Sequence, residues 1–309
     1  MLTYVMGDLF RSPAKVLVNT VNVVGVMGKG IAKDFKLIFP EMFAEYQHLC
    51  ETKRLDIGQL HIYRAPHKWI LNFPTKKHWR QPSKPEYIAA GLKTFVKIYA
   101  ANSITSIAFP PLGCGNGELD WETQVRPLME EYLRPLPIDV YVHLHRKDQF
   151  SPEHRNIQET KRWLRSEPES LGFVEVWEDL GDLLASRQEF TAYATGRAFT
   201  ARLTKEPETG VMIEIAGQLP VFMPQEALLD LWQFIRAAGF VDEGGLTYGL
   251  DSHSEEVFTL LRELPYLMLT RVSTDSSASD DDFTYALQLT PRTGRGQLDL
   301  FSQPQTVTR

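Results

Sequence analysis

The sequence predicts an α/β first half, in which a mostly parallel sheet lies between helices, followed by a smaller α+β domain and a polar tail. Three observations predict this. Short apolar runs alternate with amphipathic helical segments in residues 1–150, as in parallel sheets covered by helices on both faces. The chain becomes polar over residues 151–170, which we expect to be a linker, and residues 171–272 again mix possible helices and strands. From Ser273 to residue 309 the composition favours a flexible tail.

Each element of the first half has a local signal. Strands are expected at residues 15–22, 59–63, 69–73, 105–109 and 138–144. Helices are expected over 30–39, from Pro40 onward, over 85–99 and over 120–133. Proline suits a first helical turn, and Asp120 is a suitable cap for the last of these helices. Ile88, Leu92 and Phe95 recur at helical spacing.

The second half carries weaker signals. Helices are expected over 224–238 and 254–264, and strands over 198–203 and 211–216. This pattern predicts a compact α+β domain, and we find no cluster of chemically active residues within it.

The two halves differ in charge. Residues 1–150 contain 19 Lys and Arg against 14 Asp and Glu, a net charge of +5, whereas residues 151–309 contain 14 against 25, a net charge of −11. The basic half suggests contact with phosphate. The acidic half suggests a basic partner, or serves only solubility.

Composition also bears on location and cofactors. No apolar run reaches the ~18 residues that a membrane helix needs, and the first residues lack the pattern of a signal peptide. We therefore expect a cytoplasmic protein without a membrane partner. Two cysteines cannot form a disulfide framework, and the cysteines and histidines lack the spacing of a zinc site. No metal and no cofactor are expected.

Two glycine-rich loops follow predicted strands. The first runs from Asn19 through Gly30, where a strand turns into a helix whose free N–H groups favour phosphate. The second contains Gly113, Gly115 and Gly117 after the strand at 105–109. Both loops would lie at the carboxyl edge of one sheet, where such sheets bind ligands. Two loops suit a diphosphate, although an ordinary glycine turn remains the alternative for the first.

A third segment places cations beside aromatic rings at a strand end. Residues 72–80 read Asn-Phe-Pro-Thr-Lys-Lys-His-Trp-Arg. The functional interpretation gives a nucleophilic lysine, a Trp79 ring that stacks on a base, and an Arg80 guanidinium that binds phosphate. The alternative is a solvated basic loop with one half-buried tryptophan.

Together these motifs resemble those of a known family. Residues 7–9 (Gly-Asp-Leu), the pair Asn19 and Asn22, and the two loops resemble macrodomains, which bind ADP-ribose. The segment 72–80 is similar to that of the DarG antitoxins of DarT–DarG toxin–antitoxin systems. In that family the toxin attaches ADP-ribose to thymine in single-stranded DNA, and the antitoxin removes it. The resemblance covers residues 1 to about 150 and implies the macrodomain fold there.

The resemblance implies roles for individual residues. Lys76 would be catalytic, Asp8 would bind the adenine amino group, and Asn19 and Asn22 would face the distal ribose. The full set of implied ADP-ribose contacts is Asp8, Leu9, Asn19, Asn22, Val26, Met27, Gly28, Lys29, Gly30, Ile31, Pro111, Leu112, Gly113, Cys114, Gly115, Asn116 and Gly117. Lys77, His78, Trp79 and Arg80 would contact DNA. Animal relatives have an aspartate in the second loop that helps to release product; Gly117 stands at that position, so the role is vacant or is filled by water or DNA.

The implied reaction is hydrolysis of the bond between C1″ of the distal ribose and a thymine nitrogen. A neutral Lys76 would attack C1″, its pKa lowered by a desolvated pocket and by neighbouring Lys77. Alternatively, a charged Lys76 would stabilise the departing base while water attacks. The sequence leaves both routes open. It also leaves open a module that only binds ADP-ribose and sequesters the toxin, and an enzyme of small ADP-ribose metabolites.

Two further partners are expected. DarG-like antitoxins also bind their toxin directly, and a domain of net charge −11 suits the basic DNA groove of DarT. The tail contains Gln297, Leu298, Leu300 and Phe301, which resemble the short peptide that docks on the bacterial DNA sliding clamp. The alternative is that this peptide packs on its own domain.

Overall fold

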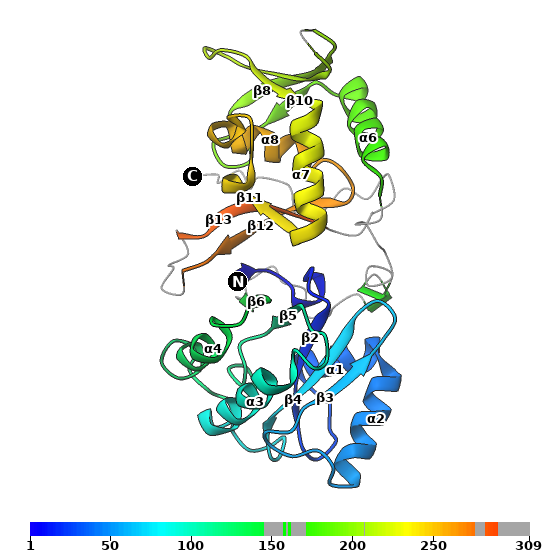
Figure 1. Cartoon of the computed structure of the whole chain (residues 1–309), viewed down its shortest axis with the longest axis vertical. Coiled ribbons are helices and arrows are strands. Elements are labelled where there is room, and N and C mark those ends of the chain that lie inside the picture. Colours follow the sequence, from blue (N-terminus) through cyan, green and yellow to red (C-terminus); the bar gives the residue numbers. More distant parts are fainter. Residues whose placement is uncertain (145–156, 159, 162–170, 207, 276–281, 290–309) are drawn as a thin grey trace, which may run out of the picture.

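The computed structural model describes residues 1–144, 157–158, 160–161, 171–206, 208–275 and 282–289. The first half forms the lower part of Figure 1, and the second half forms the upper part. Strands β11 (Phe240–Asp242), β12 (Leu267–Ser273) and β13 (Thr284–Leu289) lie between the two parts (Figure 1). No helix in the described ranges is long and apolar enough to cross a membrane.

The first half alternates strands and helices as predicted. Its strands are β1 (Leu2–Met6), β2 (Val16–Asn22), β3 (His61–Arg64), β4 (Trp69–Lys76), β5 (Ser106–Phe109) and β6 (Asp139–Leu144). Its helices are α1 (Gly30–Ile38), α2 (Pro40–Glu51), α3 (Pro85–Ile98) and α4 (Arg126–Leu133), with a 3-10 turn η1 (Leu9–Arg11) and a π-helical turn η2 (Trp121–Val125). The expected cap is present, since Oδ1 of Asp120 accepts a hydrogen bond from the backbone N–H of Thr123 at 2.8 Å. Strand β1 was not among the predicted elements.

The main sheet is mixed and mostly parallel. Its order is β11-β13-β12-β1-β6-β5-β2-β4-β3. The five strands β1, β6, β5, β2 and β4 are parallel to one another, whereas β3 is antiparallel to β4 and β12 is antiparallel to β1. The carboxyl ends of the five parallel strands therefore lie at one edge.

Apolar side chains cover both faces of this sheet. Val16 and Val18 of β2 pack on the face covered by α3 and α4, where Phe95 and Met129 are buried. Leu17 packs on the opposite face, covered by α1 and α2. Because successive side chains of a strand point to opposite faces, an unbroken apolar run such as that of β2 is buried on both sides. Figure 1 shows α1 and α2 on one side of the sheet and α3 and α4 on the other.

The second half adds a separate antiparallel sheet and its own core. The small sheet has the order β10-β9-β8-β7, from β7 (Glu189–Thr191), β8 (Ala198–Thr204), β9 (Gly210–Ile215) and β10 (Val221–Pro224). Its helices are α6 (Phe173–Ser186), α7 (Gln225–Ala238) and α8 (Ser254–Leu261), with 3-10 turns η4 (Glu243–Gly245) and η5 (Leu250–His253). The remaining strands, β11 (Phe240–Asp242), β12 (Leu267–Ser273) and β13 (Thr284–Leu289), join the main sheet. The predicted α+β character is confirmed, and helix α6 is an addition to it.

The prediction of a flexible tail from Ser273 is wrong for its first part. Strand β13 falls within that segment and lies between β11 and β12. Strand β13 is part of the folded core because the side chains of Ala286 and Leu287 are fully buried. The local Ser/Asp-rich composition hides this short apolar run. Gln297, Leu298, Leu300 and Phe301 lie outside the described residues.

Candidate functional site

Loops that follow parallel strands meet at the carboxyl edge of the main sheet. Residues 7–9 follow β1, residues 23–29 follow β2, residues 77–80 follow β4, and residues 110–117 follow β5. Strands β4 and β5 both flank β2, so the last three loops are neighbours. The predicted site residues of these loops are therefore brought to one edge, where open sheets of this kind bind ligands.

The first glycine loop is fixed by the side chain of Asn22. Its Oδ1 accepts hydrogen bonds from the N–H groups of Val24 (3.1 Å) and Val26 (3.3 Å), and its Nδ2 donates to the carbonyl of Val26 (2.6 Å). The hydroxyl of Tyr46, from α2, donates to the carbonyl of Asn22 at 2.8 Å. Asn22 thus stabilises the conformation of the loop through these hydrogen bonds, and it is also a predicted ribose contact.

The start of α1 offers N–H groups to a ligand. The helix begins at Gly30, and no side chain caps it at Lys29. Gly28, Lys29 and Gly30 are exposed, Ile31 is partly exposed, and Val26 has 41% of its surface exposed. Met27 instead is buried under the loop. An uncapped helix start with an exposed glycine turn is suited to an anion such as a diphosphate.

The second glycine loop is a compact set of turns. The N–H of Cys114 donates to the carbonyl of Pro111 (3.3 Å), and that of Leu119 donates to the carbonyl of Gly113 (3.1 Å). Gly117 has no room for a side chain, because a Cβ there would lie 2.2 Å from the carbonyl oxygen of Gly113. Leu112 is buried, whereas Gly115 and Asn116 are exposed at the tip.

The two glycine loops touch each other. A Cβ at Gly30, which has a positive φ of 58°, would lie 2.8 Å from Nδ2 of Asn116. The amine of Lys76, at the end of β4, donates a hydrogen bond to the carbonyl of Asn116. Asn116 therefore links the first loop, the second loop and the predicted catalytic lysine.

Burial changes the acidity of Lys76. Partial desolvation lowers the pKa of its amine below the ordinary value, and the carboxylate of Glu118 opposes this shift. Glu118 follows the second loop and has a positive φ of 64°. Desolvation is one of the two causes expected from the sequence, and it increases the fraction of neutral, nucleophilic amine.

Asp8 and Leu9 lie at the opposite end of the loop edge, after β1. Oδ1 of Asp8 accepts a hydrogen bond from the N–H of Phe10 at 3.1 Å and caps the turn η1. Leu9 is buried in the core between the sheet and α1. His143, at the end of neighbouring β6, is buried; burial lowers its pKa to about 4 despite the nearby charge of Asp8.

Asn19 is fully buried and belongs to a chain of polar side chains that the sequence analysis missed. Its Nδ2 donates to Oδ1 of Asn72 at 2.8 Å, and Nδ2 of Asn72 lies 3.0 Å from Nδ1 of His61. Nε2 of His61 lies 3.4 Å from a carboxylate oxygen of Glu45 on α2. The chain runs across three strands beneath the first loop. A polar Asn72 inside the apolar run of β4 was the signal that could have revealed it.

The segment after Lys76 is exposed and compact. The rings of His78 and Trp79 stack with centroids 5.6 Å apart, and the Arg80 guanidinium lies 4.2 Å from the Trp79 centroid. Lys77 and Arg80 are exposed, and Trp79 has 43% of its surface exposed. This is a cationic and aromatic surface next to Lys76.

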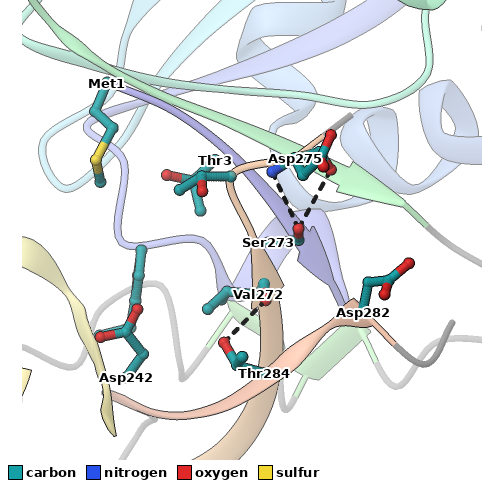
Figure 2. Close-up of a pocket in the computed structure, with 10 residues that line it drawn as sticks. Met1, Thr3, Asp242, Val272, Ser273, Asp275, Asp282 and Thr284 are labelled. Carbon is teal, nitrogen blue, oxygen red and sulfur yellow. Dashed lines mark hydrogen bonds between the residues drawn. The ribbon is translucent and has the colours of Figure 1, made fainter. Parts of the chain in front are cut away.

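A cavity of about 460 Å³ lies elsewhere, at the beginning of β1 (Figure 2). Its lining residues include Thr3, Asp242, Ser273, Asp275 and Asp282. Figure 2 shows Ser273 bonded to Asp275 and Thr284 bonded to Val272. None of the predicted ADP-ribose contacts lines this cavity.

The first half of the chain is similar in sequence to known proteins. The Macro domain family matches residues 18–128. The DNA ADP-ribosyl glycohydrolase of Mycobacterium tuberculosis is 46% identical over 147 residues, which are 46% of this chain and 42% of that protein. A Thermosipho africanus DNA ADP-ribosyl transferase–DNA ADP-ribosyl glycohydrolase fusion protein is 38% identical over 162 residues, 46% of this chain and 42% of the fusion. This chain thus spans less than half the length of these two relatives.

Two further matches cover nearly the whole of the protein that is matched. The bovine ADP-ribose glycohydrolase OARD1 is 30% identical over 145 residues, 46% of this chain and 90% of OARD1. The solved macrodomain of Mycobacterium tuberculosis DarG is 46% identical, with a TM-score of 0.45, over 48% of this chain and 99% of that one. With its parallel sheet, its two glycine loops and the matches to the Macro domain model and to OARD1, the chain belongs to the macrodomain family.

Proposed function

We propose that the protein is a DNA ADP-ribosyl glycohydrolase that removes ADP-ribose from thymine in single-stranded DNA. The observation that carries the proposal is the partly desolvated amine of Lys76, which is bound to the backbone of the second glycine loop where that loop touches the first. The name and 46% identity of the mycobacterial relative support the same activity.

Different loops bind different parts of ADP-ribose. The start of α1 and the second glycine loop hold the diphosphate through backbone N–H groups. The carboxylate of Asp8 accepts from the adenine amino group, with Leu9 beside it. Asn19 and Asn22 hold the distal ribose side of the pocket, through their bonds to β4 and to the first loop.

Two routes cleave the bond. In the first, the Lys76 lone pair attacks C1″ and the bonding pair leaves with the thymine nitrogen, which takes up a proton. The ring of the resulting glycosylamine then opens: the C1″–O4″ bond breaks, O4″ takes a proton, and the nitrogen lone pair forms the iminium. Water adds to C1″ of the iminium, and the Lys76 amine leaves to release ADP-ribose. In the second, protonated Lys76 stabilises the departing thymine anion while water attacks C1″. The lowered pKa of Lys76 favours the first route, and Glu118 favours the second.

DNA on either side of the modified base lies along residues 77–80. Trp79 stacks on a neighbouring base, and Lys77, His78 and Arg80 contact phosphates. Such contacts predict DNA binding that weakens steeply as the salt concentration rises.

The test uses a thymine-ADP-ribosylated oligonucleotide and measures unmodified DNA and free ADP-ribose. The wild-type chain should release both, whereas Lys76→Ala should release neither and still bind ADP-ribose. Lys93→Ala, an exposed lysine on α3, is the matched control and should retain full activity. Normal turnover by Lys76→Ala would refute the assignment. Borohydride added during turnover should trap a protein–ADP-ribose adduct on the first route only.

The second candidate is a non-catalytic ADP-ribose-binding module. The touching glycine loops support binding whether or not hydrolysis follows. Tight binding of ADP-ribose with no release from the oligonucleotide would establish this alternative.

We propose in addition that the acidic half binds and neutralises a DarT toxin. The net charge of −11 over residues 151–309 supports it, and the Thermosipho relative is by name a fusion of a transferase and a glycohydrolase. Full-length Lys76→Ala, which lacks hydrolysis, should still inhibit toxin-catalysed modification of DNA, and high salt should weaken this inhibition. Inhibition that is insensitive to salt would exclude an electrostatic mechanism.

Docking on the DNA sliding clamp is a separate proposal that rests on the sequence of the tail alone. A double change of Gln297→Ala and Phe301→Ala should abolish clamp binding by the full chain. Unaltered binding in solution would refute this role.

A further inference from the structure

The acidic half reaches the predicted adenine end of the site through strand β12. Tyr4 pairs with Ser273, Val5 with Val272 and Met6 with Arg271. Because the strands are antiparallel, residues 267–270 of β12 continue beyond Met6, beside the loop that contains Asp8. Oγ1 of Thr270, which is 7% exposed, donates to the carbonyl of Met6 at 3.5 Å.

Strand β13 holds the turn that follows Asp8. Nε2 of Gln288 donates to the carbonyl of Arg11 at 2.6 Å, and Gln288 is 4% exposed. The guanidinium of Arg11 in turn contacts the sulfur of Met268 on β12 at 3.5 Å. A buried side-chain amide that binds a main-chain carbonyl fixes the position of that carbonyl, since breaking the bond leaves a polar group without a partner.

Apolar packing joins the same two segments. Leu9 and Phe10 of the turn share one buried cluster with Val272, Phe240 and Ala286 of the acidic half. The end of α7 also approaches closely, because a Cβ at Gly239 would lie 1.9 Å from Cβ of Pro13. The turn is therefore enclosed by the acidic half on one side.

Asp8 belongs to this turn. Its Oδ1 is committed to the N–H of Phe10, so the direction of its other carboxylate oxygen depends on where the turn lies. We propose that the acidic half positions Asp8 for the adenine of ADP-ribose, with Gln288 and Thr270 as positioning residues. This inference rests on the proposed function of the site. Reciprocally, ADP-ribose stabilises the contact between η1 and β12–β13, because coupling between two sites acts in both directions.

The experiment compares full-length Gln288→Ala with Gln233→Ala, the same change at an exposed position of α7. Binding of free ADP-ribose is measured by calorimetry below the unfolding temperature of both variants. Gln288→Ala should raise Kd about five-fold, and should raise KM for the modified oligonucleotide similarly with kcat unchanged. Thr270→Val, which keeps the shape of the side chain, should act in the same direction. Gln233→Ala should bind as the wild type does.

Hydrogen exchange supplies a second measurement. ADP-ribose added to the wild-type chain should slow amide exchange in residues 267–270 and 286–289. A folded Gln288→Ala with the wild-type Kd and no change in KM would overturn the inference, even if its melting temperature falls. Unchanged exchange in those residues on ADP-ribose binding would also overturn it. Failure of the wild type to bind ADP-ribose would instead refute the proposed site, and the inference with it. Binding without hydrolysis would refute the proposed hydrolase activity and leave the proposed ADP-ribose site and this inference intact.

Discussion

Gly117→Ala should disrupt the second glycine loop by a direct clash with main chain. A Cβ at Gly117 would lie 2.2 Å from the carbonyl oxygen of Gly113 and 2.4 Å from Oγ of Ser83. Neither group is a free end of a flexible side chain, since Gly113 O is backbone and Ser83 is buried. Ordinary contact would require Gly113 and Gly117 to separate by more than ~1 Å, given the usual 3.5–4.0 Å between packed atoms.

The magnitude follows from two terms. Overpacking of a filled site costs about 1–3 kcal/mol. Displacement of Gly117 also strains the hydrogen bond from the N–H of Ser83 to its carbonyl, 2.9 Å long, which contributes about 1 kcal/mol. We expect the free energy of unfolding to fall by about 2–4 kcal/mol, measured by urea titration of the full chain with circular dichroism. ADP-ribose binding should weaken as well, because Asn116 and the Lys76 contact move with the loop.

Gly115→Ala is the matched control, two residues away in the same loop. No atom lies within 4 Å of a Cβ at Gly115, and its φ is not positive. Its unfolding free energy should stay level or rise by up to about 1 kcal/mol, since alanine restricts the unfolded chain. Equal stabilities for the two variants would refute the argument from the close approach of Gly117 to Gly113.

Three other changes test separate parts of the site. Glu118→Gln removes the charge that raises the pKa of Lys76, so the limb of the rate–pH profile that reports Lys76 should move to lower pH. On the covalent route the neutral amine is active, so the rising limb moves. On the electrostatic route the charged amine is active, so the falling limb moves. An unchanged profile would contradict the electrostatic effect of Glu118 on Lys76. Tyr46→Phe removes the hydroxyl that donates to the carbonyl of Asn22, and should lower the unfolding free energy by about 1 kcal/mol in a urea titration. Burial lowers the pKa of His143 to about 4, so the unfolded chain binds the additional proton between about pH 6.5 and pH 4. From pH 7 to pH 5 the wild type should therefore lose about 2 kcal/mol more unfolding free energy than His143→Gln, and equal losses would exclude this group.

The sequence predicted those parts of the fold that have local signals. The apolar run of β2, the spacing of Ile88 and Leu92 in α3, and the Asp120 cap all depend on neighbours within a few residues. The loops that carry Gly30, Gly117 and Lys76 were predicted because each follows a buried strand.

The parts of the fold and of the site that the sequence did not predict depend on contacts between distant segments. Strand β1 is short and was recognisable only through its pairing with β6 and β12. Strand β13 was assigned to the tail because the charged and hydroxyl residues before it outweigh its four buried positions. The chain from Asn19 through Asn72 to His61 joins three strands, and no periodic pattern records which polar side chains meet in a core.

The pairing of β1 with β12 also has a consequence for synthesis on the ribosome. Met6 and Thr270 are 264 residues apart in the chain, so the main sheet reaches its full width only when the last third has been translated. Contacts of such long range form late, because the intervening chain must first be ordered. The nascent N-terminal domain therefore exists for a time with the outer side of β1 open, and the arrival of β12 and β13 completes the main sheet.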